Sequence, residues 1–310
     1  MLRILFALVA IATAFTAPPA MAQKRVALSF DDIPRQAGAF MTPEERTERI
    51  LAALSAAEIE QVAFFVNPGH LEAPEKAGAE RLIAAYTAAG HVIANHSYSH
   101  GHLSKTSAEN YLADIDLAQE WLVGREGYRP WFRFPYLDEG AGDLEKRDTV
   151  RAGLATRGLS NGYVTADGSD WHLEALTVQA QRSGKAMNEK HLRRLYVASQ
   201  MSGLEYHDQL ARDTLGRSPA HVMLLHETDL AALFLPDLIA EMRKQGWTII
   251  TTDEAYADPI AQEQPNVPYA WGTLIGSMAW QRDVPPPLHP QWMSTGMITH
   301  LFETRVIEQK

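Results

Sequence analysis

Two adjacent carboxylates and two histidines are the residues of this chain best suited to metal chemistry. Asp31 and Asp32 close a short apolar run, and His96 and His100 lie four positions apart later in the chain. Two histidines and one carboxylate form a common catalytic Zn²⁺ site that keeps one coordination position open for water. The second carboxylate would then be free to accept a proton from that water. The pattern predicts a metal-dependent hydrolase.

Ordinary structural roles are the alternative for these residues. A single His-x3-His can be two surface or capping histidines, and it presents both rings on one face only if the segment forms a helical turn. The two aspartates could cap the segment that follows them, because Pro34 is typical of a turn. Three further polar clusters, around Arg133, Asp170 and His226, favour the metal hypothesis.

Short apolar and β-branched runs, typical of buried strands, alternate along the chain with segments of helical periodicity. Strands are predicted at residues 25–30, 61–66, 91–95, 131–134, 161–165, 221–226 and 247–251. The alternation predicts an α/β fold with a parallel sheet, in which functional side chains gather at the carboxyl ends of the strands. Each polar cluster follows one of these strands, so we expect a single shared site.

Other parts of the chain predict helices and an extension. Thr42 and Thr106 each precede a glutamate by three residues, as in a capping box at a helix start. The polar stretch 172–212 predicts an inserted helical element. After residue 255 the chain is rich in proline and tryptophan. We expect this tail to be an irregular strap packed across the domain, with a wall of the substrate groove as the alternative.

The N-terminus and the composition indicate an exported protein. A basic start, an apolar stretch and a small-residue site ending at Ala22 predict a signal peptide of residues 1–22. Pro18 and Pro19 interrupt the apolar stretch, which disfavours a membrane anchor. No later segment predicts stable membrane insertion, so we expect a periplasmic or secreted protein. One domain is predicted over residues 23–255, with residues 256–310 as an extension packed on it.

The charge and the cysteine content exclude some classes of partner and some sources of stability. The net charge of −10 disfavours nucleic acid as a partner, because phosphate binding requires a basic surface. The chain of 310 residues has no cysteine, so the fold must be held by packing rather than by disulfides. The sequence does not indicate an oligomeric state.

Five ordered motifs resemble those of the polysaccharide deacetylases, the NodB-homology enzymes of carbohydrate esterase family 4. They are Ser29–Asp32, His96–His100, Arg133–Tyr136, Asp167–Trp171 and Leu224–His226. The resemblance covers residues 24–255. It implies a distorted (β/α) barrel of about seven parallel strands and a divalent metal, with Zn²⁺ preferred over Co²⁺ or Ni²⁺. It also implies the removal of acyl groups, typically N-acetyl, from a carbohydrate substrate.

The resemblance assigns the metal and the base to particular residues. Asp32, His96 and His100 correspond to the metal ligands, and Asp31 corresponds to the general base that takes a proton from the attacking water. Arg133 would hold Asp31 ionised through a charge-assisted hydrogen bond. An ordinary surface ion pair is the alternative role for this arginine.

The remaining motif residues would bind the substrate or assist the leaving group. His226 corresponds to the general acid for the leaving sugar amine, and Asp170 would orient it and raise its pKa. The backbone N–H of Tyr136 would face the oxyanion. Trp171 and Leu224 would line the pocket for the acetyl methyl group, with plain core packing as the alternative for both.

The substrate class follows from the resemblance, with two alternatives. An exported member of this family would act on peptidoglycan or a chitooligosaccharide. The residues after Tyr136, Leu137 to Gly140, depart from the family pattern, so an unusual groove is expected. One alternative is the same metal chemistry on another amide, an imide or an ester. The other is a non-catalytic glycan-binding protein, which would need neither a base nor an acid.

Overall fold

The computed structural model describes residues 23–72, 78–287 and 294–308. The predicted signal peptide and, within the predicted tail, residues 288–293 and 309–310 lie outside these residues. Within the three described ranges, no helix combines the length and the apolar character that crossing a membrane requires.

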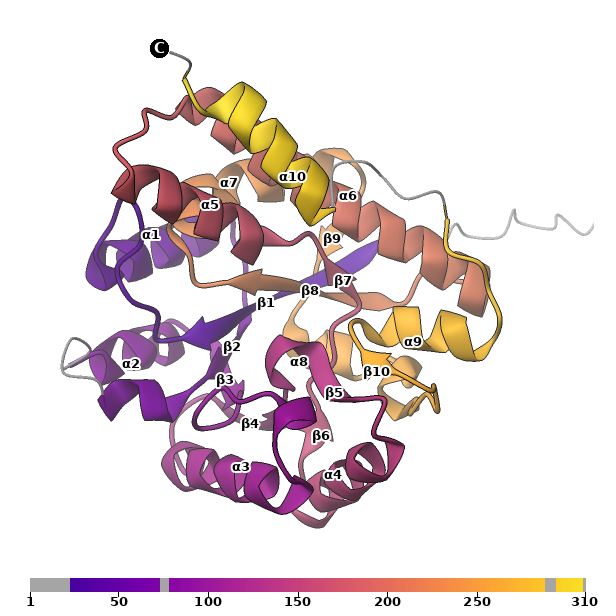
Figure 1. Ribbon diagram of the computed structural model, residues 1–310. Helices are drawn as coiled ribbons and strands as arrows, with labels where there is room; N and C mark the ends of the chain where they lie inside the picture. Colours follow the sequence, from indigo (N-terminus) through magenta and orange to yellow (C-terminus); the bar gives the residue numbers. More distant parts are fainter. Residues whose placement is uncertain (1–22, 73–77, 288–293, 309–310) are drawn as a thin grey trace, which may run out of the picture.

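A curved sheet of parallel strands forms the centre of the molecule (Figure 1). Seven strands follow the order β6, β4, β3, β2, β1, β8, β7, and the short β9 pairs with the first two residues of β1. The sheet is open between its two end strands, β6 and β7, which are consecutive in the chain. The predicted distorted (β/α) barrel is therefore confirmed. The strands are β1 (Arg25–Ile33), β2 (Ala63–Val66), β3 (Val92–Asn95), β4 (Tyr128–Phe132), β6 (Ser160–Asn161), β7 (Ala166–Asp167), β8 (Ala220–His226) and β9 (Thr248–Ile249).

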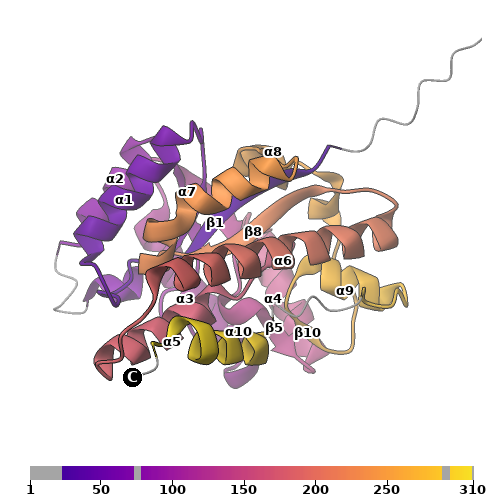
Figure 2. The same cartoon turned by 90° about the horizontal axis from the view of Figure 1, so that it is seen from above.

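Helices surround this sheet, as Figures 1 and 2 show from two directions. A separate two-stranded ribbon pairs β5 (Asp138–Ala141) with β10 (Ala270–Trp271). The α-helices are α1 (Pro43–Ala56), α2 (Glu80–Ala88), α3 (Ala108–Leu122), α4 (Leu144–Thr156), α5 (Asp170–Arg182), α6 (Glu189–Leu215), α7 (Asp229–Lys244), α8 (Thr252–Tyr256), α9 (Leu274–Gln281) and α10 (Thr295–Leu301). Shorter helices are η1 (Pro68–Glu72), η3 (Leu103–Lys105), η4 (Pro135–Leu137), η5 (Pro259–Gln262) and η7 (Phe302–Val306).

Alternate residues of the central strands pack into different apolar clusters, because side chains along a strand point to opposite faces. In β2, Phe64 and Val66 pack with residues of the surrounding helices, whereas Ala63 and Phe65 pack with residues of β3 and Trp131. Both faces of the sheet are thus apolar, as is typical of parallel strands. The polar groups are left to the strand ends, where the site forms.

Two predicted element boundaries differ from the structure. The strand expected at residues 161–165 is split, because β6 ends at Asn161 and β7 begins at Ala166. Thr42 caps α1 with the predicted capping box, but the N-cap of α3 is Ser107 rather than Thr106. The Ser107 side chain accepts the N–H of Asn110, so the cap is displaced by one residue.

The tail also contains more regular structure than the expected irregular strap. It forms α9, α10 and β10, and Ile275 and Met278 of α9 pack in one cluster with Leu210 of α6. Phe302 belongs to the main core. The stretch 172–212 is helical as predicted and consists of most of α5 and α6, which connect β7 to β8.

Candidate functional site

Asp32, His96 and His100 meet at the carboxyl ends of β1 and β3, with one potential ligand atom of each residue within 4.8 Å of the others. His100 Nε2 lies 2.8 Å and His96 Nε2 lies 3.4 Å from Asp32 Oδ1. This buried oxygen makes no hydrogen bond to any residue that the structure describes. Asp32 Oδ1 thus lies beside two imidazoles and, within the described ranges, has no hydrogen bond. The set of one carboxylate oxygen and two imidazole nitrogens therefore fits a divalent metal.

Two contacts orient the ligand atoms of this set. His96 Nδ1 lies 3.0 Å from the carbonyl oxygen of Arg133, so a neutral His96 donates its Nδ1 proton there and presents the Nε2 lone pair. Arg35 Nη1 donates to Asp32 Oδ2 at 2.6 Å, which leaves Oδ1 directed toward the histidines. Hydrogen bonds of this kind fix ring and carboxylate orientation around metals.

The loops that carry these residues have unusual backbone conformations. Asp32, Ser97 and His100 have φ values of 67°, 65° and 58°, in the left-handed region that residues other than glycine seldom adopt. Asn95 Oδ1 accepts the N–H of Ser97 at 2.8 Å, and Ser97 Oγ accepts the N–H of His100 at 3.0 Å. A bent loop, rather than the helical turn considered from the spacing, therefore presents the two histidines. Strain of this kind is concentrated at functional sites.

Asp31 lies beside the three residues, and Arg133 fixes its orientation. Arg133 Nη1 donates to Asp31 Oδ1 at 2.5 Å, and both side chains are almost completely buried. The other oxygen, Oδ2, lies 3.6 Å from His96 Nε2. The carboxylate therefore has one oxygen on Arg133 and one directed toward the candidate metal ligands.

The Arg133 side chain is itself held by four groups from distant parts of the chain. Besides Asp31, Arg133 donates to the Gly162 carbonyl at 2.7 Å, to Ser29 Oγ at 2.9 Å and to Tyr256 Oη at 2.8 Å. Its guanidinium carbon also lies 3.7 Å from the centre of the Phe65 ring. The alternative of an ordinary surface ion pair for Arg133 is wrong, because the group is buried and fully engaged.

His226 lies on the neighbouring strand and is held by Asp170. The backbone register of β1 and β8 pairs Asp31 directly with His226. Asp170 Oδ1 lies 2.7 Å from His226 Nδ1, and Asp170 Oδ2 accepts the backbone N–H of His226 at 2.7 Å. Burial alone would lower the pKa of His226, but the hydrogen-bonded Asp170 and, to a lesser extent, Asp32 raise it to about 9.

The three residues expected to contact substrate differ in exposure. Tyr136 and Trp171 are 48% and 44% exposed, so plain core packing does not describe Trp171. Leu224 is buried in β8, in register with Ser29 of β1, as core packing would predict. The Tyr136 ring lies beside His100, with 4.5 Å between the ring centroids.

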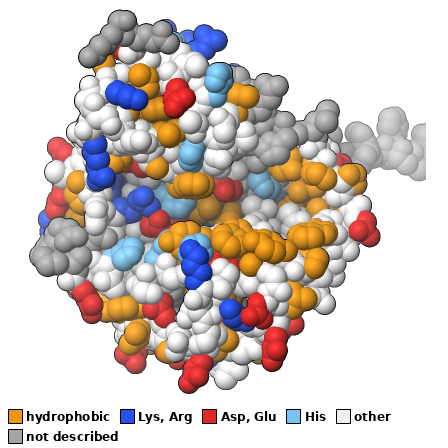
Figure 3. Space-filling view, viewed as in Figure 1, with side chains coloured by type: hydrophobic (Ala, Val, Ile, Leu, Met, Phe, Trp, Pro, Cys, Tyr) orange, Lys and Arg blue, Asp and Glu red, His pale blue; other side chains and the backbone are white. Residues whose placement is uncertain are grey.

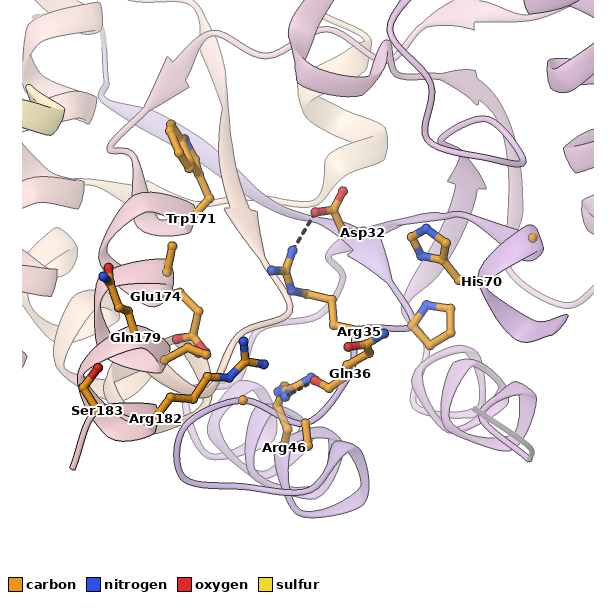
Figure 4. Close-up of a pocket in the computed structure, with 16 residues that line it drawn as sticks. Asp32, Arg35, Gln36, Arg46, His70, Trp171, Glu174, Gln179, Arg182 and Ser183 are labelled. Carbon is orange, nitrogen blue, oxygen red and sulfur yellow. Dashed lines mark hydrogen bonds and ion pairs between the residues drawn. The ribbon is translucent and has the colours of Figure 1, made fainter. Parts of the chain in front are cut away.

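A pocket of about 740 Å³ adjoins Asp32 (Figure 4). It lies between the loop 34–38, the segment around His70, and one face of α5 from Trp171 onward. Burial and the nearby Asp229 raise the pKa of Glu174, on the floor of this pocket, to about 7. Of the residues predicted from sequence, only Asp32 and Trp171 line this pocket.

Sequence analysis missed several residues that support the site. Arg35 and Tyr256 bind predicted site residues, and Asn95 binds Ser97 in the loop between the two candidate histidine ligands, yet none of the three stands in a recognisable motif. Tyr256 is far from Arg133 in sequence and carries no local signal. His102 lies at the site edge, where its Nδ1 is 3.2 Å from Asp138 Oδ2.

Comparison with protein families gives a match in the first half of the chain. The model of the polysaccharide deacetylase family matches residues 19–155. A peptidoglycan-N-acetylglucosamine deacetylase from Bacillus cereus is 32% identical over 126 residues, which are 40% of this chain and 40% of that protein. The chain thus matches about two fifths of the length of this curated relative.

Comparison with solved structures gives matches at low sequence identity. A family 4 carbohydrate esterase pseudoenzyme from Bacillus anthracis is 18% identical, with a TM-score of 0.50 and coverage of 75% of this chain and 65% of that one. A family 4 carbohydrate esterase from Streptomyces lividans is 21% identical, with a TM-score of 0.48 and coverage of 74% and 92%. Because the first is described as a pseudoenzyme, the shared fold alone assigns no activity.

Proposed function

We propose that the chain is a member of the polysaccharide deacetylase family, whose model matches residues 19–155, and that it is a metal-dependent hydrolase that removes N-acetyl groups from a glycan. The observation that carries the proposal is the meeting of three candidate metal ligands with a candidate base and a candidate acid on adjacent strands. A pure binding protein would need neither Asp31 nor His226 in these positions.

The metal site of this proposal consists of Asp32, His96 and His100. When bound, a divalent metal such as Zn²⁺, Co²⁺ or Ni²⁺ would lower the pKa of water and polarise the acetamide carbonyl. His96 Nε2 is available for this role because Nδ1 faces a carbonyl oxygen. Arg35 keeps the other oxygen of Asp32 away from the ligand position.

Asp31 and His226 would perform the two proton transfers of the hydrolysis. Asp31 Oδ2 accepts a proton from the attacking water, while Arg133 holds Oδ1 and fixes the direction of the carboxylate. His226 donates a proton to the leaving sugar amine, since the neighbouring Asp170 keeps it protonated at neutral pH. The backbone N–H of Tyr136 would face the developing oxyanion. Trp171 and Leu224 would lie around the acetyl group.

The substrate that fits this proposal is a β-linked N-acetylated glycan of the peptidoglycan or chitooligosaccharide type. The similarity to the Bacillus cereus peptidoglycan-N-acetylglucosamine deacetylase supports this class. We propose that the signal peptide predicted for residues 1–22 directs the enzyme to the periplasm or outside the cell, where such glycans are found.

Acetate release from metal-free and metal-loaded protein tests the function. We expect purified protein to release acetate from N-acetylated peptidoglycan fragments or chitooligosaccharides. A chelator should stop acetate release, and added Zn²⁺ or Co²⁺ should restore it. Asp31→Asn should reduce kcat by about 10²- to 10⁴-fold, the usual effect of losing a general base. Asp213→Asn, the same change at an exposed carboxylate on α6, is the matched control.

Two outcomes would contradict the proposal. Ammonia or a ring-opened acid without acetate, from a panel that includes imides and O-acetyl esters, would assign the site to a different bond. Full activity of Asp31→Asn on a verified substrate would remove this residue from the role of base.

A further inference from the structure

Three exposed aromatic side chains form a continuous surface at one edge of the candidate site. They are Tyr136, which follows β4, and Tyr269 and Trp271, which lie in the C-terminal tail; we call them the aromatic platform. We propose that the aromatic platform stacks a second sugar ring of the glycan, next to the ring that carries the reacting acetyl group. This inference rests on the proposed function and specifies a substrate of at least two sugars.

The aromatic platform begins at the candidate metal site and extends away from it. Tyr136 lies 4.5 Å from His100 and stacks on His102, with 3.7 Å between centroids and 7° between ring planes. Trp271 lies 5.7 Å from His102, and Tyr269 lies 6.3 Å from Trp271 with the rings nearly parallel at 11°. Figure 3 shows hydrophobic side chains gathered in a band on this face, beside histidines.

Large parts of the aromatic platform face solvent, although apolar rings are usually buried. Tyr136, Tyr269 and Trp271 are 48%, 48% and 40% exposed. Aromatic side chains offer about 150–250 Å² each, so the exposed area is on the order of 300 Å². A stable protein interface needs about 800 Å² per partner, whereas a stacked sugar ring needs far less. The exposed area therefore fits a small ring rather than a protein.

The polar atoms at the edges of these rings are available to a ligand. Among the residues that the structure describes, Tyr136 Oη, Tyr269 Oη and Trp271 Nε1 have no hydrogen-bond partner. A pyranose ring combines an apolar C–H face with hydroxyl groups at its edge. Tyrosine and tryptophan match this combination, because each has an apolar face and a polar tip. Exposed apolar patches rimmed by such polar groups are typical of ligand grooves.

The backbone below the aromatic platform is fixed by contacts between the tail and the loop after β4. Trp271 of β10 pairs with Asp138 of β5, and the N–H of Gly272 donates to the Leu137 carbonyl at 3.0 Å. Asp138 is completely buried. Its side chain accepts the Gly140 N–H at 2.9 Å and two hydrogen bonds from Ser104. The rings are thus held in place before a ligand arrives, which lowers the entropy lost on binding.

The position of the aromatic platform has a consequence for specificity. Tyr269 and Trp271 lie outside the residues matched by the family model, 19–155. The tail would therefore give this chain a preference for oligosaccharides over the N-acetylated monosaccharide. The same pairing explains why residues 137–140 depart from the family pattern. Most of these residues form β5, which is the strand that pairs with β10 of the tail.

Steady-state kinetics of Trp271→Ala on substrates of different length test the proposal. We expect KM for an N-acetylglucosamine tetrasaccharide, or for a peptidoglycan tetrasaccharide, to rise about tenfold, corresponding to ~1.4 kcal/mol of lost stacking. We expect kcat to change less than twofold, and kcat/KM for N-acetylglucosamine to stay the same. Trp271→Phe keeps an aromatic face and should recover most of the affinity.

The matched control is Trp280→Ala, which removes a tail tryptophan of similar exposure, 50%, on α9. It lies outside the aromatic platform and should leave all constants unchanged. The proposal is wrong if Trp271→Ala behaves like Trp280→Ala, or if Trp271→Ala weakens monosaccharide and tetrasaccharide turnover equally.

A binding measurement separates this proposal from the proposed function. Binding of the two tetrasaccharides and of N-acetylglucosamine is titrated by isothermal titration calorimetry with the Asp31→Asn protein, with and without Trp271→Ala. Tighter binding of a tetrasaccharide than of the monosaccharide, lost with Trp271→Ala, would support the aromatic platform even if no acetate is released. Acetate release with no effect of Trp271→Ala on binding would support the proposed function and overturn the proposed role of the aromatic platform. Failure of both tetrasaccharides to bind would also overturn that role.

Discussion

His226 illustrates how one contact can set the chemistry of a residue. Its imidazole is buried, which alone would favour the neutral form, yet the Asp170 carboxylate lies 2.7 Å from Nδ1. This charge raises the pKa of His226 to about 9. A general acid must be protonated before it can act, so the candidate acid is ready at neutral pH and loses its proton as the pH rises through its pKa.

Asp170→Asn should therefore move the alkaline limb of the kcat–pH profile to lower pH. Asparagine removes the negative charge that stabilises the imidazolium, while burial continues to favour the neutral ring, so we expect a shift of about one to two pH units. A bound metal would lower the pKa in both proteins, which makes the difference between them the quantity to measure. Asp213→Asn serves as the control.

A different result would assign Asp170 a structural role. If kcat falls by the same factor at every pH, with no movement of the alkaline limb, Asp170 would only position the strand end. Asp170→Asn would also disturb the hydrogen bond from the backbone N–H of His226 to Asp170 Oδ2, whether Asp170 sets the pKa of His226 or only positions the strand end. The rate at a single pH therefore cannot separate these two roles.

The sequence contained the site residues but not the geometry that joins them. Asp31, Asp32, His96 and His100 were recognisable because their types and spacing suit a metal and a base. The left-handed conformation at Ser97 and His100 was not predictable, because it depends on side-chain bonds within the loop and non-glycine residues rarely adopt it. The contact between Tyr256 and Arg133 joins segments that are far apart in the sequence and meet only in the folded structure, so no local pattern encodes it.

At the scale of elements, Asp229 at the start of α7 holds the loop between β1 and α1. Its Oδ2 accepts the backbone N–H groups of Phe40 and Met41 at 2.7 and 3.0 Å, and Oδ1 accepts Arg46 Nε at 2.9 Å. Arg46 and Asp229 are almost completely buried. The same loop carries Arg35, which binds Asp32, so the contact connects packing to the site.

Asp229→Ala should lower the free energy of unfolding by about 3–5 kcal/mol, because it leaves the buried Arg46 without its main counter-ion. Urea unfolding followed by circular dichroism measures this change. Asp213→Ala removes an exposed carboxylate that is hydrogen-bonded to Gln209, and it should lower the free energy of unfolding by less than about 1 kcal/mol. Equal unfolding midpoints for the two variants would show that the buried pair contributes no more than a surface contact.

Elements were predicted best where periodicity or capping chemistry was local. The Thr42 cap and the buried strands β1, β2, β3 and β8 followed from residue patterns. The break between β6 and β7 did not, because the barrel opens there and residues 162–165 pair with neither strand as a ladder. The tail was misjudged since its prolines indicated irregular structure, while α9 and α10 are short helices stabilised by packing on α6.

At the scale of the whole molecule, the site requires more of the chain than the family match covers. Residues 19–155 include the candidate metal ligands, Asp31 and Arg133, but not Asp170 or His226. The tail extends this dependence, because Phe302 lies in the same apolar cluster as Phe30 and Leu225 of the central sheet. We therefore propose that residues 23–255 and the extension 256–310 unfold together.

Phe302→Ala tests this joint unfolding. Removing a buried aromatic side chain from the main core should lower the free energy of unfolding by about 3–5 kcal/mol. If the tail and the barrel share one core, thermal unfolding should remain a single transition at lower temperature, with coincident curves from tryptophan fluorescence and far-ultraviolet circular dichroism. Trp280→Ala, exposed on α9, should change stability by less than about 0.5 kcal/mol.

An early transition confined to the tail, followed by unchanged unfolding of the barrel, would instead make the extension an independent unit. Acetate release would then persist above the first transition, because the candidate ligands, base and acid all lie before residue 256.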